Sequence, residues 1–266
     1  MKQDINDRQG QQFSTSAHVV ALGNPPLPKK AKEHKMKLLK LIEDQSRRYH
    51  HRDVFIDFVT VAAIELARAD FGQVDRREAI YMERLARYNK VEQTRFVAML
   101  HELVEAMDAC PSDILGEVYM EMGMGNARTG QYFTPIEMCK LMAGLTMQRV
   151  TQEKLDHEGH VRLHEPACGS GSMIIAAMEA LRMRGINYQQ HIHVTAIDLD
   201  PTAAKMAFIQ LSLLHVPAVV IHGNTLTLQQ FEVWYTPAHI LDGWAMRLHR
   251  QGEQIATAAA TTSASA

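Results

Sequence analysis

The 266-residue chain has only three cysteines, few aromatic residues and no long apolar run. Cys110, Cys139 and Cys168 are far apart and form no Cys-x-x-Cys pair, which argues against a disulfide framework or a zinc knuckle and indicates a reducing compartment. No apolar run of about eighteen residues is present, and residues 1–10 are polar, so neither a membrane span nor a secretory signal is predicted. We therefore expect a cytoplasmic protein without a membrane partner.

A metal site is not predicted either, although the chain has fourteen histidines. The pairs at positions 50 and 51 and at positions 191 and 193 lack the helical i, i+4 spacing of a paired metal ligand. The aromatic content of 6% also leaves few side chains for stacking on single-stranded nucleic acid. We therefore expect no metal cofactor.

Neither sign of charge dominates, because 28 Lys and Arg residues oppose 30 Asp and Glu residues for a net charge of −2 at pH 7. Any nucleic-acid contact must therefore come from a local basic surface. Residues 29–52 hold such an excess, with nine basic side chains against three acidic ones. We interpret this stretch as a solvated helix face, and phosphate contacts that position DNA without reading its sequence are the alternative.

Changes in composition divide the chain into four parts. Residues 1–28 are rich in Gln, Ser, Asn and Pro and are expected to form a flexible arm. Residues 29–126 are predicted to form a helical domain of about four or five helices, because Pro and Gly are scarce before Cys110 and apolar residues recur at helical spacing. Residues 127–250 form a second predicted domain, and the Thr, Ala and Ser tail at 251–266 is expected to be disordered.

The second domain shows the pattern of an α/β fold with a parallel sheet. Apolar strand candidates at 161–164, 193–197 and 218–221 alternate with helical stretches at 173–184 and 202–214. This alternation predicts a βαβαβ unit with helices on the faces of the sheet. Further helices are predicted over 136–148, 238–249 and, with Ser112 or Asp113 as the N-cap, over 114–122.

A glycine turn follows the first predicted strand, where residues 165–173 read Glu-Pro-Ala-Cys-Gly-Ser-Gly-Ser-Met. Gly169 and Gly171 let a ligand approach the backbone with no Cβ in the way, and the helix start presents unpaired N–H groups. A dinucleotide fingerprint has a third glycine near Ile174, and its absence disfavours a pyrophosphate ligand. Taken alone, the glycine pair is equally compatible with a structural turn.

Polar side chains at the ends of the next two strands suit a nucleoside. Asp198 ends the second strand, where a carboxylate is placed to accept hydrogen bonds from the paired hydroxyls of a ribose. Asn224 ends the third, and its amide offers an adenine edge both a donor and an acceptor. Each feature alone also fits a turn or a helix cap. In this order and at this spacing, however, they predict a ligand that contains a ribose and needs no phosphate.

Two motifs resemble one known family. The run Gly-Gln-Tyr-Phe-Thr-Pro at 130–135 and the run Glu-Pro-Ala-Cys-Gly-Ser-Gly-Ser at 165–172 resemble the S-adenosylmethionine-binding half of the N6-adenine DNA methyltransferases. The chain also resembles the modification subunits of type I restriction systems, which likewise carry a helical N-terminal domain. The resemblance covers about residues 115–226 and implies a Rossmann-like methyltransferase sheet with S-adenosylmethionine as cofactor. It further implies DNA as substrate, and a specificity subunit, a catalytic subunit or a second copy as partner.

The resemblance also implies roles for individual residues. Thr134 and the turn before it are implied to hold the methionine carboxylate of the cofactor, Asp198 its ribose hydroxyls, and Leu199 one face of its adenine. Asn224 stands where the family usually has Asp facing the adenine amino group, and Asn still offers a carbonyl acceptor. The implied cofactor contacts are Tyr132, Phe133, Thr134, Glu165, Ala167, Gly169, Gly171, Asp198, Leu199 and Asn224.

The part of the family pattern that handles the target base is missing after Asn224. The family flips the adenine out of the duplex and holds it with an Asn-Pro-Pro-aromatic tetrad after the fourth strand. The amide and a backbone carbonyl accept the two amino hydrogens, and the aromatic ring stacks on the base. Only three strands are predicted here, so the sheet is expected to be truncated, with its first strand left as an exposed edge.

Two segments offer alternative catalytic residues. Asn24, Pro25 and Pro26 reproduce three letters of the tetrad after an apolar run, but Leu27 is not aromatic, so a linker is the favoured interpretation. The Tyr-Thr-Pro run at 235–237 offers an aromatic ring and a carbonyl, and a packing turn is favoured there.

Two main hypotheses follow for the function. One is a DNA adenine-N6 methyltransferase, complete or as a subunit of a modification complex. The other is a catalytically silent relative that binds the cofactor and acts as a partner or regulator, which the missing tetrad favours. A decayed product that binds neither ligand is a third possibility, against which the intact glycine turn and Asp198 argue.

Overall fold

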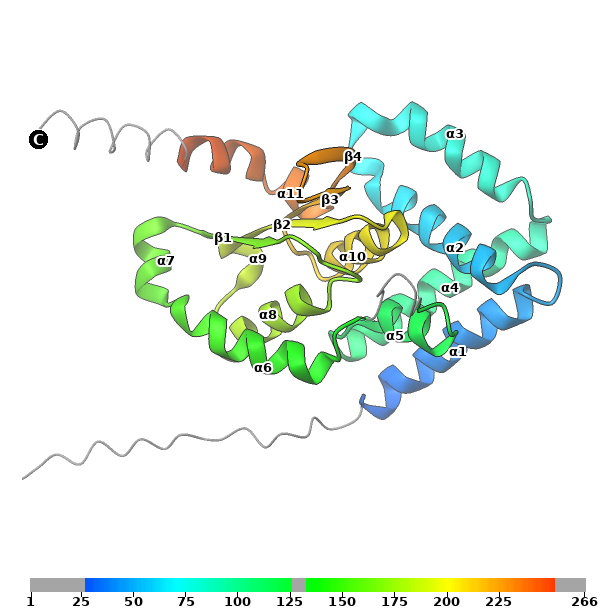
Figure 1. The fold of residues 1–266 in the computed structure, drawn as a ribbon, viewed down its shortest axis with the longest axis horizontal. Coiled ribbons are helices and arrows are strands. Elements are labelled where there is room, and N and C mark those ends of the chain that lie inside the picture. Colours follow the sequence, from blue (N-terminus) through cyan, green and yellow to red (C-terminus); the bar gives the residue numbers. More distant parts are fainter. Residues whose placement is uncertain (1–26, 126–132, 252–266) are drawn as a thin grey trace, which may run out of the picture.

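The computed structural model describes residues 27–125 and 133–251, and in it a helical part packs against a small α/β sheet (Figure 1). Of the expected arm at 1–28, residues 1–26 lie outside the described residues. The predicted helical part is present, and it begins at Lys29. Its elements are α1 (Lys29–Gln45), α2 (His51–Leu66), η1 (Ala67–Ala69), η2 (Phe71–Gln73), α3 (Val74–Leu85), α4 (Lys90–Ala109) and α5 (Ile114–Glu121).

Side-chain caps define where two of these helices begin. Asn89 and Glu92 form a capping box at the start of α4, in which each side chain accepts a hydrogen bond from the other residue's backbone N–H. Asp113 accepts from the N–H of Gly116 at 3.0 Å, which confirms the prediction that an aspartate here caps α5.

The basic stretch lies on α1 and the start of α2, and several of its lysines are paired with acidic side chains. Lys35 is buried and donates to Glu117 and Glu121 of α5, at 2.7 Å in both cases. Lys30 lies 3.3 Å from Glu105 of α4. For these lysines the structure supports an ion-paired helix face instead of an open phosphate-binding surface.

The sheet has four strands in the order β1-β2-β3-β4. The first three are parallel, as predicted, and β4 is antiparallel to β3. The strands are β1 (Val161–Glu165), β2 (Ile192–Asp198), β3 (Ala218–Asn224) and β4 (Gln229–Tyr235). The helices of this part are α6 (Ile136–Thr146), η3 (Met147–Arg149), α7 (Gln152–Glu158), α8 (Ser172–Met183), α9 (Tyr188–His191), α10 (Pro201–Leu213) and α11 (Pro237–Leu241), and residues 244–251 are also helical.

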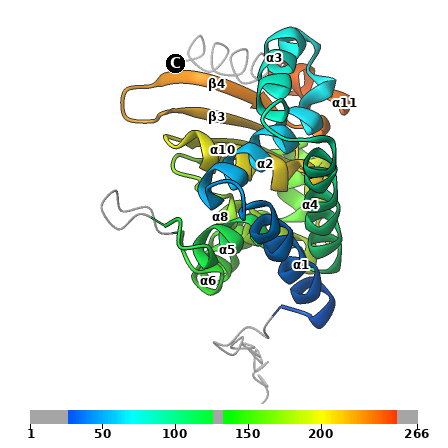
Figure 2. The same ribbon diagram turned by 90° about the vertical axis from the view of Figure 1, so that its right-hand side faces the viewer.

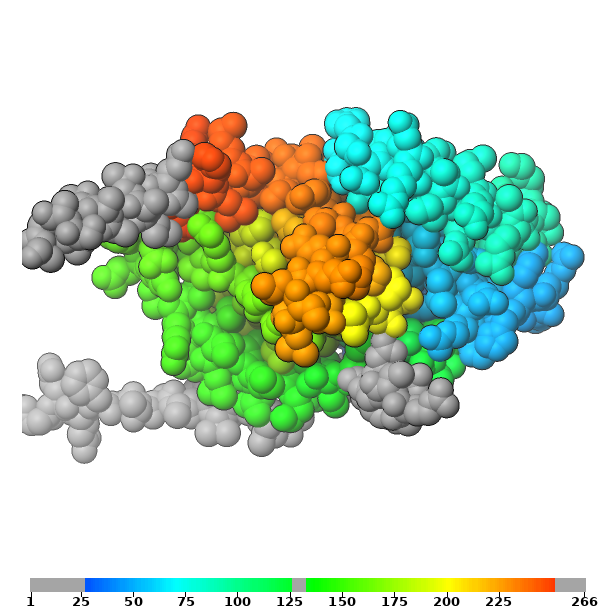
Figure 3. Space-filling view, turned by 45° about the horizontal axis from the view of Figure 1, so that its top comes forward, coloured from blue at the N-terminus to red at the C-terminus, as the bar shows by residue number. Residues whose placement is uncertain are grey.

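The prediction of three strands was wrong, because it missed β4. This strand begins with Gln229 and Gln230, and only Trp234 in it is buried, so its sequence lacks the apolar run of a central strand. β4 pairs with β3 alone and lies at the surface beside α3 (orange and cyan in Figure 3). The predicted helix over 238–249 is interrupted as well, since Gly243 has a φ of +66° between α11 and residues 244–251.

Helix α10 joins the two parts of the molecule, because it contacts β2 and β3 on one side and α2 on the other (Figure 2). α2 is correspondingly buried along most of its length. The buried apolar side chains form one cluster that runs from α1 through α2 and α10 to the sheet. One continuous hydrophobic core therefore includes residues from both sides of the predicted domain boundary at 126–127.

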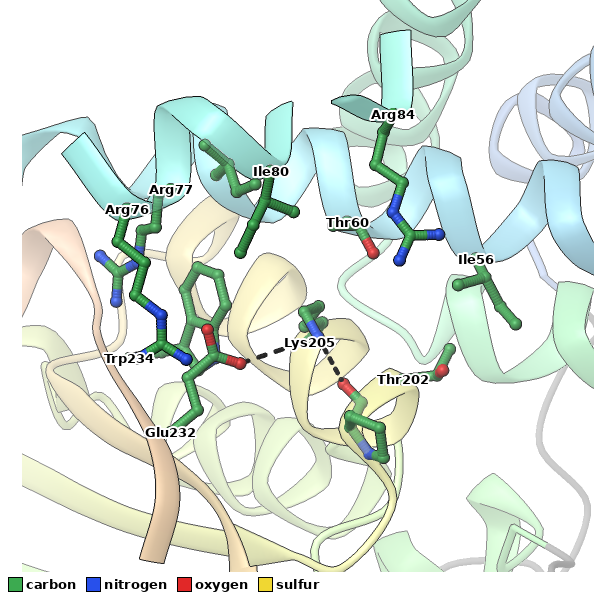
Figure 4. Close-up of a pocket in the computed structure, with 12 residues that line it drawn as sticks. Ile56, Thr60, Arg76, Arg77, Ile80, Arg84, Thr202, Lys205, Glu232 and Trp234 are labelled. Atoms are coloured by element: carbon green, nitrogen blue, oxygen red, sulfur yellow. Dashed lines mark hydrogen bonds and ion pairs between the residues drawn. The ribbon is translucent and has the colours of Figure 1, made fainter. Parts of the chain in front are cut away.

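A second junction connects α3 to β4 (Figure 4). The Arg77 guanidinium lies 4.2 Å from the centre of the Trp234 ring, and it donates to the carbonyl of Val233 at 3.0 Å and to Asp70 at 2.9 Å. A cavity of about 260 Å³ lies beside these side chains. Its lining includes an ion pair, in which Nζ of Lys205 lies 3.8 Å from Oε2 of Glu232. These contacts fix the helical part on the β4 side of the sheet.

The opposite edge of the sheet is open, as expected from the sequence. Within residues 27–125 and 133–251, β1 pairs with β2 and with no other strand. In the same ranges, no helix combines the length and the apolar character needed to cross a membrane.

Candidate cofactor-binding site

Three predicted site residues lie together at the carboxyl ends of the parallel strands. Because β1, β2 and β3 are parallel, their carboxyl ends lie side by side, and these ends carry Glu165, Asp198 and Asn224. Thr225 donates to the carbonyl of Pro166 at 2.6 Å, which ties the end of β3 to the turn after β1. The topology therefore gathers residues that are up to about sixty positions apart in the sequence.

The turn after β1 depends on its two glycines. Gly169 has a φ of +55° and Gly171 a φ of +98°, both in the region that side chains disfavour. A Cβ on Gly169 would lie 2.9 Å from the Phe133 ring, which leaves no space for one. Phe133 is thereby placed against the turn, so the described part of the Gly-Gln-Tyr-Phe-Thr-Pro motif lies beside the glycine turn.

The Asp198 carboxylate is held by the backbone of two loops. One oxygen accepts from the N–H of Gly169 at 2.7 Å and the other from the N–H of Asp200 at 2.8 Å. Burial raises the pKa of Asp198, and these two N–H groups oppose that rise. The N–H of Leu199 interacts with the carboxylate as well, and a carboxylate has about four acceptor sites, so it is oriented and still able to accept from a ligand.

Two further predicted cofactor contacts, Leu199 and Asn224, differ in how accessible their side chains are to a ligand. Leu199 is 62% exposed directly beyond the tip of β2, so its apolar face is open to a ligand. The Asn224 side-chain oxygen accepts from the N–H groups of Leu226 and Thr227, at 3.0 and 3.2 Å, and so caps the β3–β4 turn. Both lone pairs of this oxygen are engaged, so the side chain takes the turn-capping role that the sequence left open as the alternative.

The segment before α6 borders a second cavity. Thr134 and Ala167 are exposed, whereas Tyr132 lies outside the described residues. The Phe133 ring packs 5.4 Å from that of Tyr119 on α5, measured between ring centres. Between α5 and residues 133–137 lies a cavity of about 360 Å³, whose lining includes Thr134 and four acidic side chains, Asp113, Glu117, Glu121 and Glu137.

A buried polar network supports the glycine turn from behind, and sequence reasoning missed it. Asp113 accepts from the Ser170 hydroxyl at 2.5 Å and from the Gln210 amide at 2.8 Å. Gln210 also donates to the carbonyl of Ser170 and accepts from the N–H of Leu115. Burial raises the pKa of Asp113, and its donors from Gln210 and Ser170 oppose that rise. The network locks α5, the turn and α10 together.

Of the two alternative catalytic segments, one lies outside the described residues and the other lies away from this site. Asn24, Pro25 and Pro26 lie outside the described residues. Tyr235 pairs with Val219 at the start of β3, which is the opposite end of the strand from Asn224. Thr236 is buried and caps α11, so the Tyr-Thr-Pro run is a packing turn, as favoured from the sequence.

The residues present fit a nucleoside-sulfonium ligand. The glycine turn brings the chain to the tip of β2, Asp198 offers an oriented acceptor for hydroxyls, and Leu199 offers an open apolar face. Within residues 27–125 and 133–251, no cluster of three or more His, Cys, Asp and Glu side chains is arranged to hold a metal ion.

Comparisons with known proteins agree with this assignment. The N-6 DNA methylase family matches residues 111–253, which is more than half of the chain. A type I restriction enzyme methylase subunit, MjaVIII of Methanocaldococcus jannaschii, is 34% identical over 130 residues, which are 45% of this chain and 20% of that protein. The chain thus spans only a fifth of the length of this curated relative.

A solved structure was also found to be similar. It is a Listeria monocytogenes protein described as a class I S-adenosylmethionine-dependent methyltransferase, with a TM-score of 0.41 and 13% sequence identity over 70% of this chain and 52% of that one. On the family match, the chain belongs to the N-6 DNA methylase family and its cofactor is S-adenosylmethionine.

Proposed function

We propose that this chain is the cofactor-binding part of a DNA adenine-N6 methyltransferase of the type I modification-subunit kind. The observation that carries the proposal is the Asp198 carboxylate, fixed against the glycine turn at the carboxyl ends of three parallel strands. The family match supplies the reaction class, and the similarity to the archaeal methylase subunit supports the finer description.

The proposed binding mode follows from the chemistry of each side chain. Asp198 accepts from the ribose hydroxyls, Leu199 covers one face of the adenine, and Glu165 with Ala167 and Gly169 lines the methionine and sugar. Thr134 and Phe133 close the site from the α6 side, and Gly171 keeps the turn open. The bound cofactor supplies a methyl group on a sulfonium centre, and these residues orient it.

Asn224 requires a change to the role first expected for it. With the turn intact, its oxygen is committed to two backbone N–H groups. It then presents its NH₂ group, which suits an acceptor ring nitrogen of adenine and not the exocyclic amino group.

The alternative function is a catalytically silent relative that binds S-adenosylmethionine and serves a partner. It is favoured by one observation, the absence of an Asn-Pro-Pro-aromatic tetrad between Asn224 and Gln251. Without acceptors for both amino hydrogens, the adenine nitrogen is a poor nucleophile, so methyl transfer is not expected from the described residues alone.

Transfer of labelled methyl from S-adenosylmethionine to mixed-sequence duplex DNA separates the two functions. The methyltransferase predicts label on adenine N6, found after digestion to nucleosides, and loss of that label in Asp198→Ala. If transfer occurs, full activity of Asn24→Ala eliminates the tetrad-like run in the N-terminal segment. Cofactor binding without transfer, both alone and with DNA-modification subunits from the same cell, would establish the silent relative instead.

A further inference from the structure

Basic side chains outnumber acidic ones around the cavity of about 260 Å³ that lies between α3, α10 and β4. Figure 4 shows Arg76 and Arg84 reaching toward it from α3, and Lys205 from α10. We call it the basic cavity; the charged residues in its lining are Arg76, Arg77, Arg84, Lys205 and Glu232. Because Arg77 is paired with Asp70, the other three cations decide the charge of this space.

Neighbouring carboxylates compensate only part of the positive charge on α3. Arg84 shares the buried carboxylate of Asp57 with Arg87, at 2.9 and 2.7 Å, so one negative charge serves two guanidinium groups. Nε of Arg84 is also buried and has no acceptor among the described residues. Arg76 is exposed and forms no ion pair within residues 27–125 and 133–251. Both arginines therefore keep N–H groups that can donate to an anion.

Lys205 is held out of water with a distant partner. Its side chain is 15% exposed, and its Nζ lies 3.8 Å from Glu232, which is longer than a hydrogen bond. Burial lowers the pKa of Lys205; Glu232 opposes that fall and Arg84 adds to it. An ammonium group that is mostly buried beside a second cation is costly unless an anion lies close to it.

The polar groups approach the cavity from three helices. Thr60 lines it from α2, Arg84 from α3, and Thr202 and Lys205 from α10. A tetrahedral phosphate accepts hydrogen bonds in several directions, whereas the acceptor sites of a carboxylate lie in one plane. Guanidinium forks and lysine ammonium groups are the usual phosphate ligands of proteins. The cavity has room for a phosphate group, since a water molecule takes only about 30 Å³.

We propose that the basic cavity binds a phosphate group, held by Arg76, Arg84 and Lys205. The phosphate belongs to a small solute or to the backbone of DNA, because the same donors serve both. The inference goes beyond the proposed function and does not depend on it, since the cavity shares no lining residue with the glycine turn or with Asp198.

Calorimetric titration of the full chain with inorganic phosphate near neutral pH, at constant ionic strength, tests the site. We expect saturable binding at one site per chain with a Kd of about 1 mM or tighter. Lys205→Met should weaken it at least about tenfold, because a charged hydrogen-bond donor is lost. Lys154→Met is the matched control, since Lys154 of α7 lies 3.9 Å from Glu158 and does not line the cavity, and it should bind phosphate like the wild type.

Arg76→Ala is a second variant from a different element. Arg76 is exposed and without an ion-pair partner among the described residues, so this variant is expected to fold even if Lys205→Met does not. It should also weaken phosphate binding, and circular dichroism checks the fold of each variant. Phosphate should raise the unfolding temperature of the wild type more than that of either cavity variant, because it binds only the folded chain.

Binding of mixed-sequence duplex DNA, followed by fluorescence anisotropy, distinguishes the two sources of the phosphate. If the cavity takes a DNA phosphate, Lys205→Met and Arg76→Ala weaken duplex binding beyond the effect of Lys154→Met, and inorganic phosphate competes with the duplex. If it takes a small solute, the duplex affinities of the three variants match one another while inorganic phosphate binding is lost in the two cavity variants.

Three results would overturn the proposal. One is a folded wild type that shows no saturable phosphate binding and no effect of the cavity variants on duplex binding, as expected if a carboxylate of the same polypeptide fills the cavity. The others are equal weakening by Lys154→Met, and equal affinity for acetate, which would show that the cavity does not select phosphate. Lys205→Met should bind S-adenosylmethionine like the wild type, so failure of cofactor binding would refute the proposed function and leave the phosphate site to be decided separately.

Discussion

Gly116 lies where α5 meets the glycine turn, and no side chain fits there. A Cβ at this position would lie 2.2 Å from Asp113 Oδ2 and 2.5 Å from Ser170 Oγ. Gly116→Ala should therefore lower the free energy of unfolding by about 1–3 kcal/mol in urea denaturation, because it displaces a buried hydrogen-bond network.

Gly144 of α6 is the matched control, since a Cβ there meets no atom within 4 Å. Gly144→Ala should leave stability unchanged or raise it by up to about 1 kcal/mol through helix propensity. Equal effects of the two substitutions would show that the network does not constrain α5.

His193 makes the stability of the fold depend on pH. The side chain is 3% exposed on β2, with its Nε2 2.9 Å from Nδ1 of His239. Burial, and secondly the neighbouring His239, lower the pKa of His193 from its ordinary 6.5 to about 3. The unfolded chain therefore takes up this proton more readily, so stability is complete above pH 6.5 and is lost as the pH falls toward 3.

The expected loss attributable to His193 between pH 7 and pH 5 is up to about 2 kcal/mol. His193→Gln should flatten the curve of unfolding free energy against pH by this amount, measured by denaturation at each pH. His157→Gln on the exposed side of α7 serves as the control and should keep the wild-type curve. If the unfolding free energy of His193→Gln falls with pH as steeply as that of the wild type, His193 is not the source of the pH dependence.

Between elements, one arginine connects α3 to β4. Arg77→Ala removes the ion pair with Asp70, the hydrogen bond to Val233 and the stacking on Trp234. It should destabilise the protein by about 2–4 kcal/mol, because it leaves Asp70 without its cationic partner at a mostly buried site.

Arg76→Ala, one position earlier on the exposed side of α3, should change stability by less than about 0.5 kcal/mol. Thermal unfolding of the two variants compares them directly. An Arg77→Ala protein as stable as Arg76→Ala would show that α3 is not anchored through this side chain.

The elements themselves were predictable to different degrees. β1, β2, α8 and α10 have apolar residues at strand or helix spacing and were located within one residue at each end, whereas β3 was predicted to end three residues too early. β4 was missed because an edge strand that exposes Gln229 and Phe231 and buries Trp234 has no strong apolar pattern. β4 pairs with β3 through the hairpin turn that Asn224 caps. Such a hydrogen bond forms in the folded chain and is not visible in the amino-acid composition of the segment.

At the scale of the whole molecule, the residues of the site were also predictable to different degrees. The placement of Gly169 and Gly171 in the turn after β1 and of Asp198 at the end of β2 was predictable, because it follows from the local strand and turn pattern. The Asp113–Ser170–Gln210 network was not, since its members are separated by 57 and 97 positions from Asp113 and meet only in the folded chain. Nor could the sequence show that α6 exposes Met138, Leu141, Met142 and Leu145, because the same residues suit a buried helix.

At the scale of the whole molecule, the described residues form a cofactor-binding sheet whose β4 side is fixed to a helical part, and within them β1 pairs with no strand besides β2. The central claim is that this sheet binds S-adenosylmethionine through Asp198. Isothermal titration of the wild type with S-adenosylmethionine tests it most directly, with Asp198→Ala and the exposed-site variant Val97→Ala titrated alongside and the folding of each checked by circular dichroism.

We predict one binding site per chain in the wild type and in Val97→Ala, and at least about tenfold weaker binding in Asp198→Ala, because a carboxylate that accepts from the ribose hydroxyls contributes about 1.5–3 kcal/mol. Absence of binding in the folded wild-type protein, or equal affinity in Asp198→Ala, would contradict the account.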